Sequence, residues 1–348
     1  MPAVSELRMG RLLAPTLIAA LVVATGVLLA IGGYDVGRAA EALVNGSVGS
    51  WYAIGSATLV RATPLILTGL AVALAFRAGV FNIGAEGQFL VGAAAAAAIA
   101  LTLPKTPSLI LILLALVVGA IAGAVWAWIA AVLRSRFHVL EVISTIMLNF
   151  VAAFLVSYLV RGPLQEPTHV YPQTESIVAA AQLPRFDPTT RLHLGFVLAL
   201  LACAVAWWAV RYTAAGFRLR VVGANPSAAR SAGKIDVDRV TTRVFLLSGA
   251  LSGLAGAIEV CGVTYALYEN ISPGYGYTAI AVALLARLDP AAVIATGILF
   301  GALEAGAGAM QRDANVPSVV VSVIEAGIIL ALVAADRARA MRTRSAVA

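Results

Sequence analysis

Long apolar runs separated by short polar segments dominate the pattern of this chain. Most runs are about 20 residues long, the length a helix needs to cross a hydrocarbon core of about 30 Å. The ten runs lie near residues 12–31, 54–76, 84–103, 108–133, 139–160, 193–210, 244–266, 276–286, 290–310 and 317–335. The eighth is too short to cross alone, so we expect a half-helix or part of a broken segment, buried in protein or lining a cavity. The pattern predicts an all-α polytopic membrane protein with about ten transmembrane helices, one of them short or broken.

Composition agrees with a membrane protein. The chain is 61% hydrophobic and only 12% charged, whereas soluble domains carry about 25% charged residues. A soluble helical protein with an unusually large core would leave some apolar runs uncovered. The first run could mimic a signal peptide, but it is longer than an h-region and no clear cleavage site follows, so we interpret it as the first span. Two distant cysteines and three scattered histidines predict no disulfide framework, metal site or cofactor.

Basic residues predict the orientation. The net charge of +7 could indicate nucleic-acid binding, but in a membrane protein it more often reports basic cytoplasmic loops, so no nucleic-acid partner is expected. With the N-terminus inside, 17 of the 24 lysines and arginines fall on the cytoplasmic side. The positive-inside rule therefore predicts that both termini lie inside. Ten crossings, or nine with a re-entrant pair, satisfy this prediction, and residues 1–348 form a single transmembrane domain.

Two hydrophilic segments interrupt the spans. The outer one, 162–191, is rich in proline, and the inner one, 211–243, is rich in arginine. The inner segment is expected to begin extended, to break at 223–226 and to continue as a short helix, with Asn225 or Ser227 as cap and Gly233 at its end. Such a helix is typical of a docking element for a cytoplasmic partner. A phosphate-binding loop is excluded because its glycine and hydroxyl positions are not met, and no catalytic motif is found, so the chain is not predicted to be an enzyme.

The stretch FNIGAEGQFL places Asn82, Glu86 and Gln88 beside Gly84 and Gly87 at what looks like membrane depth. Ionisable residues at that depth cost several kcal/mol unless they face a cavity or a partner. One interpretation is a broken helix start that presents these side chains to a substrate path. The other is a cytoplasmic turn in which Asn82 caps the helix and Glu86 lies in its first turn. Both remain open, and they are compatible.

Further polar side chains lie in other spans. Glu141, Thr145 and Asn149 share one helical face and could together line a polar path. For any one of them, a structural hydrogen bond between helices is the simpler role. Tyr275 and Tyr277 precede or begin the short eighth run. They could form an interfacial aromatic belt or a stacking surface for a planar or sugar-like solute. The candidate substrate path comprises Asn82, Glu86, Gln88, Glu141, Thr145, Asn149, Tyr275 and Tyr277.

Several motifs together resemble a known family of transporter subunits. They are FNIGAEGQFLVGA, EVISTIMLNFVA, LRVVGANPSAARSAG, SGALSGLAGAIEV and GYGYTAIAVALLA. These stretches, within residues 55–335, resemble the permease subunits of ABC importers in the branched-chain amino acid/ribose class, and the nucleoside-uptake branch in particular. The residues that match the family's ATPase-coupling motif are Gly223, Asn225, Pro226, Ala228, Ala229 and Gly233, with Arg230 inside the same helix. Two departures are Lys234 after the motif's glycine and the tract Leu285–Arg287.

The resemblance implies a multi-pass permease of the cell membrane that moves nucleosides inward. It implies a separate cytoplasmic ATPase subunit, a second and unlike permease subunit, and an extracytoplasmic substrate-binding protein. A permease for ribose or another simple sugar remains an alternative. A self-sufficient transporter driven by an ion gradient, with intramembrane carboxylates as ion sites, is a second one.

Overall fold

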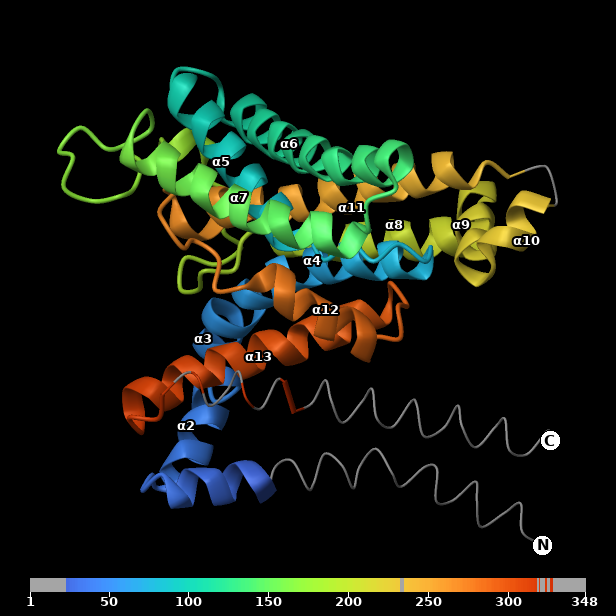
Figure 1. The fold of residues 1–348 in the computed structure, drawn as a ribbon. Coiled ribbons are helices and arrows are strands. Elements are labelled where there is room, and N and C mark those ends of the chain that lie inside the picture. Colours follow the sequence, from blue (N-terminus) through green and yellow to red (C-terminus); the bar gives the residue numbers. More distant parts are fainter. Residues whose placement is uncertain (1–22, 232–234, 318, 320–322, 324–325, 328–348) are drawn as a thin grey trace, which may run out of the picture. The chain divides into compact units, whose positions relative to one another are not determined.

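The computed structural model describes residues 23–231 and 235–317, together with residues 319, 323, 326 and 327. In this part the chain is helical, with isolated β-bridges but no strand (Figure 1). After helical residues 23–31 come α2 (Val36–Ser47), α3 (Trp51–Ala53), η1 (Ile54–Thr58), α4 (Leu59–Arg77), α5 (Ala85–Thr102), α6 (Ser108–Phe137), α7 (Glu141–Arg161), η2 (Ala179–Ala181), α8 (Gly195–Tyr212), α9 (Ala214–Ala224), α10 (Pro226–Ser231), α11 (Val237–Glu259), η3 (Val260–Thr264), α12 (Tyr275–Leu285) and α13 (Ala292–Asp313). The predicted all-α class is confirmed for these residues.

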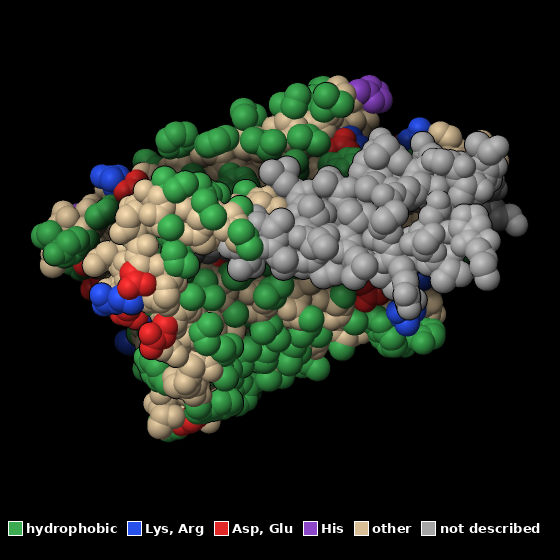
Figure 2. All heavy atoms as spheres, turned by 90° about the horizontal axis from the view of Figure 1, so that it is seen from below, with side chains coloured by type: hydrophobic (Ala, Val, Ile, Leu, Met, Phe, Trp, Pro, Cys, Tyr) green, Lys and Arg blue, Asp and Glu red, His purple; other side chains and the backbone are tan. Residues whose placement is uncertain are grey.

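Seven helical segments in the described part are long and apolar enough to cross a membrane. They are Trp51–Arg77, Ala85–Thr102, Ser108–Phe137, Glu141–Arg161, Gly195–Tyr212, Val237–Thr264 and Ala292–Asp313. Each coincides with a predicted span. Most of the predicted spans at 12–31 and 317–335 lies outside the described residues. On the face drawn in Figure 2, hydrophobic side chains cover much of the described surface, as a lipid-facing protein requires.

The short eighth run is a short helix. With 11 residues, α12 is about 16 Å long, roughly half of a hydrocarbon core. It begins after Gly274, whose φ of +104° belongs to the left-handed region that glycine adopts freely. It packs against α4 and α5.

The chain divides into two compact units, one formed by residues 1–54 and 302–348 and the other by residues 55–301. In the first unit, α2 begins after Asp35, whose carboxylate accepts a hydrogen bond from the Arg38 amide at 3.0 Å. Ala39 and Ala42 of α2 pack with Met310 of α13 in an apolar cluster. These small side chains of α2 are thereby buried, whereas Val36 and Val44 remain exposed.

In the second unit, α11 is the central helix and packs most extensively against α6, then α5 and α4. Glycines allow this close approach. A Cβ atom on Gly253 would overlap the Gly119 carbonyl oxygen, and one on Gly249 would overlap the Gly123 carbonyl oxygen. Small residues four apart let helix backbones touch in membranes, where lipid supplies no hydrophobic force between helices. These two glycine pairs therefore let α6 and α11 pack backbone to backbone.

The loops of this second unit gather at opposite ends of it (Figure 1). At one end, residues 162–194 pack along the segment after α11, with the Thr174 amide donating to the Leu267 carbonyl at 2.8 Å. At the other end lie α9 and α10, which contact each other and α11. The two hydrophilic segments identified in the sequence therefore lie on different sides of the bundle.

Candidate functional site

Three polar side chains are buried where α5 begins. Asn82 and Gln88 pair their side-chain amides reciprocally, with nitrogen–oxygen distances of 3.2 and 3.1 Å. Asn82 also donates to the Ser248 hydroxyl of α11 at 2.9 Å and accepts from the Gly84 amide at 3.0 Å. The residue that caps α5 is Gly84, and not Asn82 as one interpretation of the sequence proposed. Asn82 is fully buried. Asn82 instead joins three segments inside the bundle.

Helix α7 completes the hydrogen bonding of this irregular backbone. Thr145 accepts from the Ile83 amide at 3.2 Å. Asn149 accepts from the Gly87 amide at 2.8 Å and donates to the Ile83 carbonyl at 2.9 Å. Non-helical backbone at membrane depth needs such partners, because lipid offers none. A Cβ atom on Gly87 would lie 3.0 Å from the Asn149 Cα atom, so the glycine permits this contact.

Glu86 connects the starts of α5 and α12. Its Oε2 atom accepts from the Gly276 amide at 2.7 Å, and the Ser272 hydroxyl also bonds its carboxylate. The first amides of a helix lack intrahelical partners and carry partial positive charge, so a carboxylate there is stabilising. Beside it, the Tyr275 and Phe89 rings lie 5.8 Å apart. The sequence predicted Glu86 in the first turn of its own helix, and it lies in the first turn of α5. Its carboxylate also binds the first turn of α12.

Tyr277 forms the accessible edge of this group. Its side chain is 44% exposed, and its hydroxyl accepts from Asn149 at 3.3 Å. We call the group the polar junction, defined as Asn82, Glu86, Gln88, Thr145, Asn149, Ser248 and Tyr277. Amides, hydroxyls and a carboxylate are suited to hydrogen bonding a neutral polar solute. Most of them bond one another here, so the junction also fixes the relative positions of four helices.

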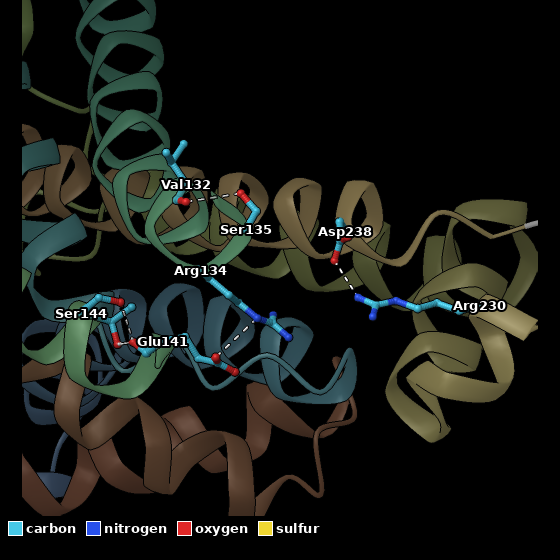
Figure 3. A network of polar contacts seen from close by, with 8 residues as sticks. Val132, Arg134, Ser135, Glu141, Ser144, Arg230 and Asp238 are labelled. Atoms are coloured by element: carbon cyan, nitrogen blue, oxygen red, sulfur yellow. Dashed lines mark hydrogen bonds and ion pairs between the residues drawn. The ribbon is translucent and has the colours of Figure 1, made fainter. Parts of the chain in front are cut away.

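Glu141 does not join the polar junction. It pairs with Arg134 across the α6–α7 turn, with 3.4 Å between Oε2 and Nε (Figure 3). The shared helical face brought Thr145 and Asn149 together as expected, but Glu141 lies at the very start of α7, one turn away from the junction. Ser248, Ser272 and Gly276 were not identified from the sequence, since each meets its partner across a large sequence separation.

The coupling segment differs from expectation in its first half. Residues 214–224 form helix α9 rather than an extended strand. Thr213 caps α9 by accepting from the Gly216 amide at 3.1 Å. Gly223 packs against the backbone of Arg77, where a Cβ atom would overlap the carbonyl oxygen. Capping and close packing favour a helix here, although the alternating basic and apolar residues of the sequence indicate an extended chain.

The second half of the segment forms the expected short helix. Asn225 caps α10, accepting from the Ala228 amide at 3.0 Å, and Pro226 occupies the first helical position, where proline is favoured. Ala229 is buried with Val222 and Val237, whereas Ala228 is exposed. Gly233 lies outside the described residues. The helix is thus anchored through one face and presents the other outward.

A polar cavity of about 340 Å³ lies between α10 and the α6–α7 turn. Arg134 and Glu141 line one side, and Arg230 and Asp238 line the other. Arg230 of α10 and Asp238 of α11 are 2.9 Å apart (Figure 3). The pair links the coupling helix directly to α11, the central helix of the unit.

The segment between α11 and α12 is tied to the end of α7 by Glu269. Its carboxylate lies 2.6 Å from Arg161 Nη2 and accepts from the Ser157 hydroxyl at 2.5 Å. These hydrogen bonds, that of Arg161 first, hold the pKa of Glu269 below its usual range. At the same end, hydrogen bonds from Gln173 and Thr168 lower the pKa of Glu166.

Glu269 should make thermal stability depend on pH. Because its folded pKa is depressed, its contribution is present above the unfolded pKa of about 4.3 and disappears as the pH falls through the folded pKa. Glu269→Gln should therefore lower the thermal midpoint by roughly 1 °C at pH 7, a small effect because the pair is exposed. In detergent, the difference between the wild type and the variant should shrink as the pH falls below the unfolded pKa and towards the folded one. A difference that grows as the pH falls would contradict this assignment.

Within the described residues, no three His, Cys, Asp or Glu side chains are grouped to hold a metal ion. The polar junction contains amides, hydroxyls and one carboxylate, without a nucleophile–base pair. Its chemistry is that of binding and positioning.

Comparisons with known proteins match most of the chain. The family described as "Branched-chain amino acid transport system / permease component" matches residues 54–333. The guanosine ABC transporter permease protein NupP of Bacillus subtilis is 40% identical over 93% of both chains. The glucose ABC transporter permease protein TsgB13 of Haloferax volcanii is 39% identical over 80% of this chain and 75% of its own. The nucleoside ABC transporter permease protein NupB of Lactococcus lactis is 33% identical over 83% and 81%.

Proposed function

Since the chain belongs to the branched-chain amino acid transport system / permease component family, we propose that it is the membrane permease subunit of an ABC importer that moves nucleosides inward. One observation carries the nucleoside assignment. The 40% identity to a guanosine permease extends over 93% of both chains, so it includes the spans, the polar junction and the coupling segment together.

A sugar permease is the second candidate, and a specific observation favours it. The glucose permease relative is 39% identical to this chain, although over a shorter length. Nucleosides and simple sugars both carry several hydroxyl groups, and the polar junction could form hydrogen bonds with the hydroxyls of either class. An ion-coupled transporter has less support, because Glu86 already binds the start of α12.

We propose ten crossings of the cell membrane with both termini inside. Three features support a cytoplasmic side at the end that carries α9 and α10. Arg77 at the end of α4 contacts Gly223 of α9, Arg134 lines the cavity that Arg230 closes, and Arg211 ends α8. Basic residues gathered at one end are typical of a cytoplasmic face.

The proposed partners follow from that arrangement. A separate ATPase subunit docks on α10, a second and unlike permease subunit completes the translocation path, and a binding protein delivers the solute to residues 162–191. ATP-driven motion of α10 reaches α11 through the Arg230–Asp238 pair and the buried Ala229. Because α11 also holds Ser248 of the junction, the motion can switch the path between two states.

The proposed substrate path passes the polar junction. Tyr277 and Asn149 form its accessible edge, and Tyr275 supports α12 from within. Asn82, Gln88 and Thr145 hold the irregular start of α5 in place. Glu141 lies apart from these residues, at the α6–α7 turn, where it pairs with Arg134.

Uptake assays test the function directly. Radiolabelled guanosine, adenosine, uridine, ribose and glucose are supplied to cells with and without the gene. We expect nucleoside uptake to vanish on deletion and to return with the gene on a plasmid, while ribose and glucose uptake is unchanged. Loss of sugar uptake alone would select the sugar permease, and uptake that survives deletion of the ATPase would select the ion-coupled class.

Docking of the ATPase is tested by bulk on the exposed face of α10. Ala228→Trp should reduce uptake at least tenfold and abolish co-purification of the ATPase subunit, because a large side chain there would separate the two surfaces. The thermal midpoint should be unchanged, since Ala228 is exposed. Ala179→Trp, an exposed alanine at the opposite end, is the matched control and should retain the ATPase. Equal ATPase retention by both variants would contradict docking on α10.

A further inference from the structure

An apolar groove of about 380 Å³ lies between α4, α8, α9 and α11. It begins beside Leu70 and Leu251, in the middle of their helices, and continues past Ala206 and Leu247. Its lining is almost entirely aliphatic, and Gly216 in this lining packs closely on the backbone of α8. A groove of this kind on a membrane protein is open to lipid acyl chains rather than to water.

Two arginines line the end of the groove that faces α9. Arg218 of α9 and Arg243 of α11 are both exposed, and among the described residues neither forms an ion pair. This distinguishes them from Arg211 and Arg230, which have acidic partners. Two guanidinium groups at the mouth of an apolar groove are complementary to an anion joined to a hydrocarbon chain.

Aromatic side chains mark the depth of this mouth. Trp208 and Tyr212 at the end of α8 are exposed, and Arg211 lies 4.7 Å from the centre of the Trp207 ring. Tryptophan and tyrosine gather where the hydrocarbon region meets the headgroups. The arginines therefore lie at the level of lipid phosphates, with the groove extending from them into the hydrocarbon region.

We propose that this groove binds an anionic phospholipid, with one acyl chain along α8 and the headgroup phosphate between Arg218 and Arg243. Basic pockets between transmembrane helices bind anionic headgroups on the same physical grounds. The inference depends on the chain spanning a membrane but not on which solute it carries. Because the site joins α9 to α11, a bound lipid would hold the coupling segment against the bundle.

Lipid-dependent thermal stability of the full-length permease tests the proposal. The chain is purified in a mild detergent, stripped of lipid and titrated with phosphatidylglycerol, with phosphatidylcholine of identical chains, or with glycerol 3-phosphate. A ligand that binds the folded state raises the thermal midpoint. We expect phosphatidylglycerol to raise it most, and glycerol 3-phosphate, which has no acyl chain, to leave it unchanged.

Variants locate the effect. Arg218→Gln with Arg243→Gln should raise the half-effective phosphatidylglycerol concentration about tenfold, whereas Arg136→Gln, an exposed arginine outside the groove, should not. Ala206→Phe should fill the groove and remove the shift, whereas Ala204→Phe on the outer face of α8 should preserve it. If the double variant does not fold, the single arginine variants carry the test. Equal shifts with both lipids, a full shift with glycerol 3-phosphate, or a shift unaffected by the groove variants would overturn the proposal.

Discussion

Gly253→Val is expected to abolish folded permease, and uptake with it. Gly253 lies where α11 contacts two helices at once. A Cβ atom there would overlap the Gly119 carbonyl oxygen of α6, and Gly92 of α5 packs against the same backbone. Overpacking a core usually costs about 1–3 kcal/mol, but here neither neighbour is a side chain that can turn away. We therefore expect a loss above about 4 kcal/mol, a large part of a stability of about 5–15 kcal/mol.

The fraction of protein recovered as a single species after detergent extraction measures this effect, together with its thermal midpoint. Gly308→Val is the matched control, because among the described residues a Cβ on this helical glycine meets only the end of the flexible Arg312 side chain, at 3.4 Å. Gly253→Ala should lie between the two. Recovery of Gly253→Val equal to that of Gly308→Val would show that α5, α6 and α11 do not pack as described.

Helical spans could be predicted from the sequence because length and hydropathy are local properties. The seven long apolar helices and the short α12 coincide with eight of the predicted runs. Glycine pairs such as Gly119 and Gly123 could also be identified, since four-residue spacing places them on one helical face. Which helix they would contact could not be predicted, because many spans present small residues.

The polar junction shows where local information ends. Asn82 and Glu86 could be recognised as unusual at membrane depth, which is a property of their own neighbourhood. Their partners, Ser248 and Gly276, lie 166 and 190 residues away in the sequence. Nothing in the neighbourhood of either residue distinguishes it from the other serines and glycines of the chain. The predicted substrate path therefore contained most junction residues but also Glu141, which shares their helical face and not their location.

The prediction for the coupling segment was correct in its second half only, for a similar reason. A short helix capped by Asn225 or Ser227 was predicted, and Asn225 is the cap, through a hydrogen bond to a residue three positions away. The helix begins at Pro226, inside the break that the sequence predicted. The segment before them alternates basic and apolar residues, which indicates an extended chain. In the structure α9 is helical because Thr213 caps it and Gly223 packs on Arg77, and the second of these contacts is invisible in the sequence.

Replacing Glu86 by leucine is expected to lower uptake about 100-fold. The buried carboxylate accepts from the Gly276 amide and is bonded by Ser272, so its removal leaves the start of α12 without these partners. Losing charge-assisted hydrogen bonds at a buried site costs about 3 kcal/mol, which corresponds to about 100-fold in rate or affinity. The leucine side chain is similar in size, so the effect reports lost hydrogen bonds rather than an empty space. Initial uptake rates at equal membrane levels measure it.

Glu86→Gln is the decisive companion because it separates two transport mechanisms. A glutamine carbonyl oxygen can still accept from the Gly276 amide, so an ATP-driven permease should retain uptake within about tenfold of the wild type. An ion-coupled transporter that uses Glu86 as its ion site would lose transport as completely with glutamine as with leucine, and an ionophore would abolish wild-type uptake while ATP remains. The two substitutions differ by one charge and one set of hydrogen bonds. Their ratio therefore tells whether Glu86 holds α12 in position or binds a coupling ion.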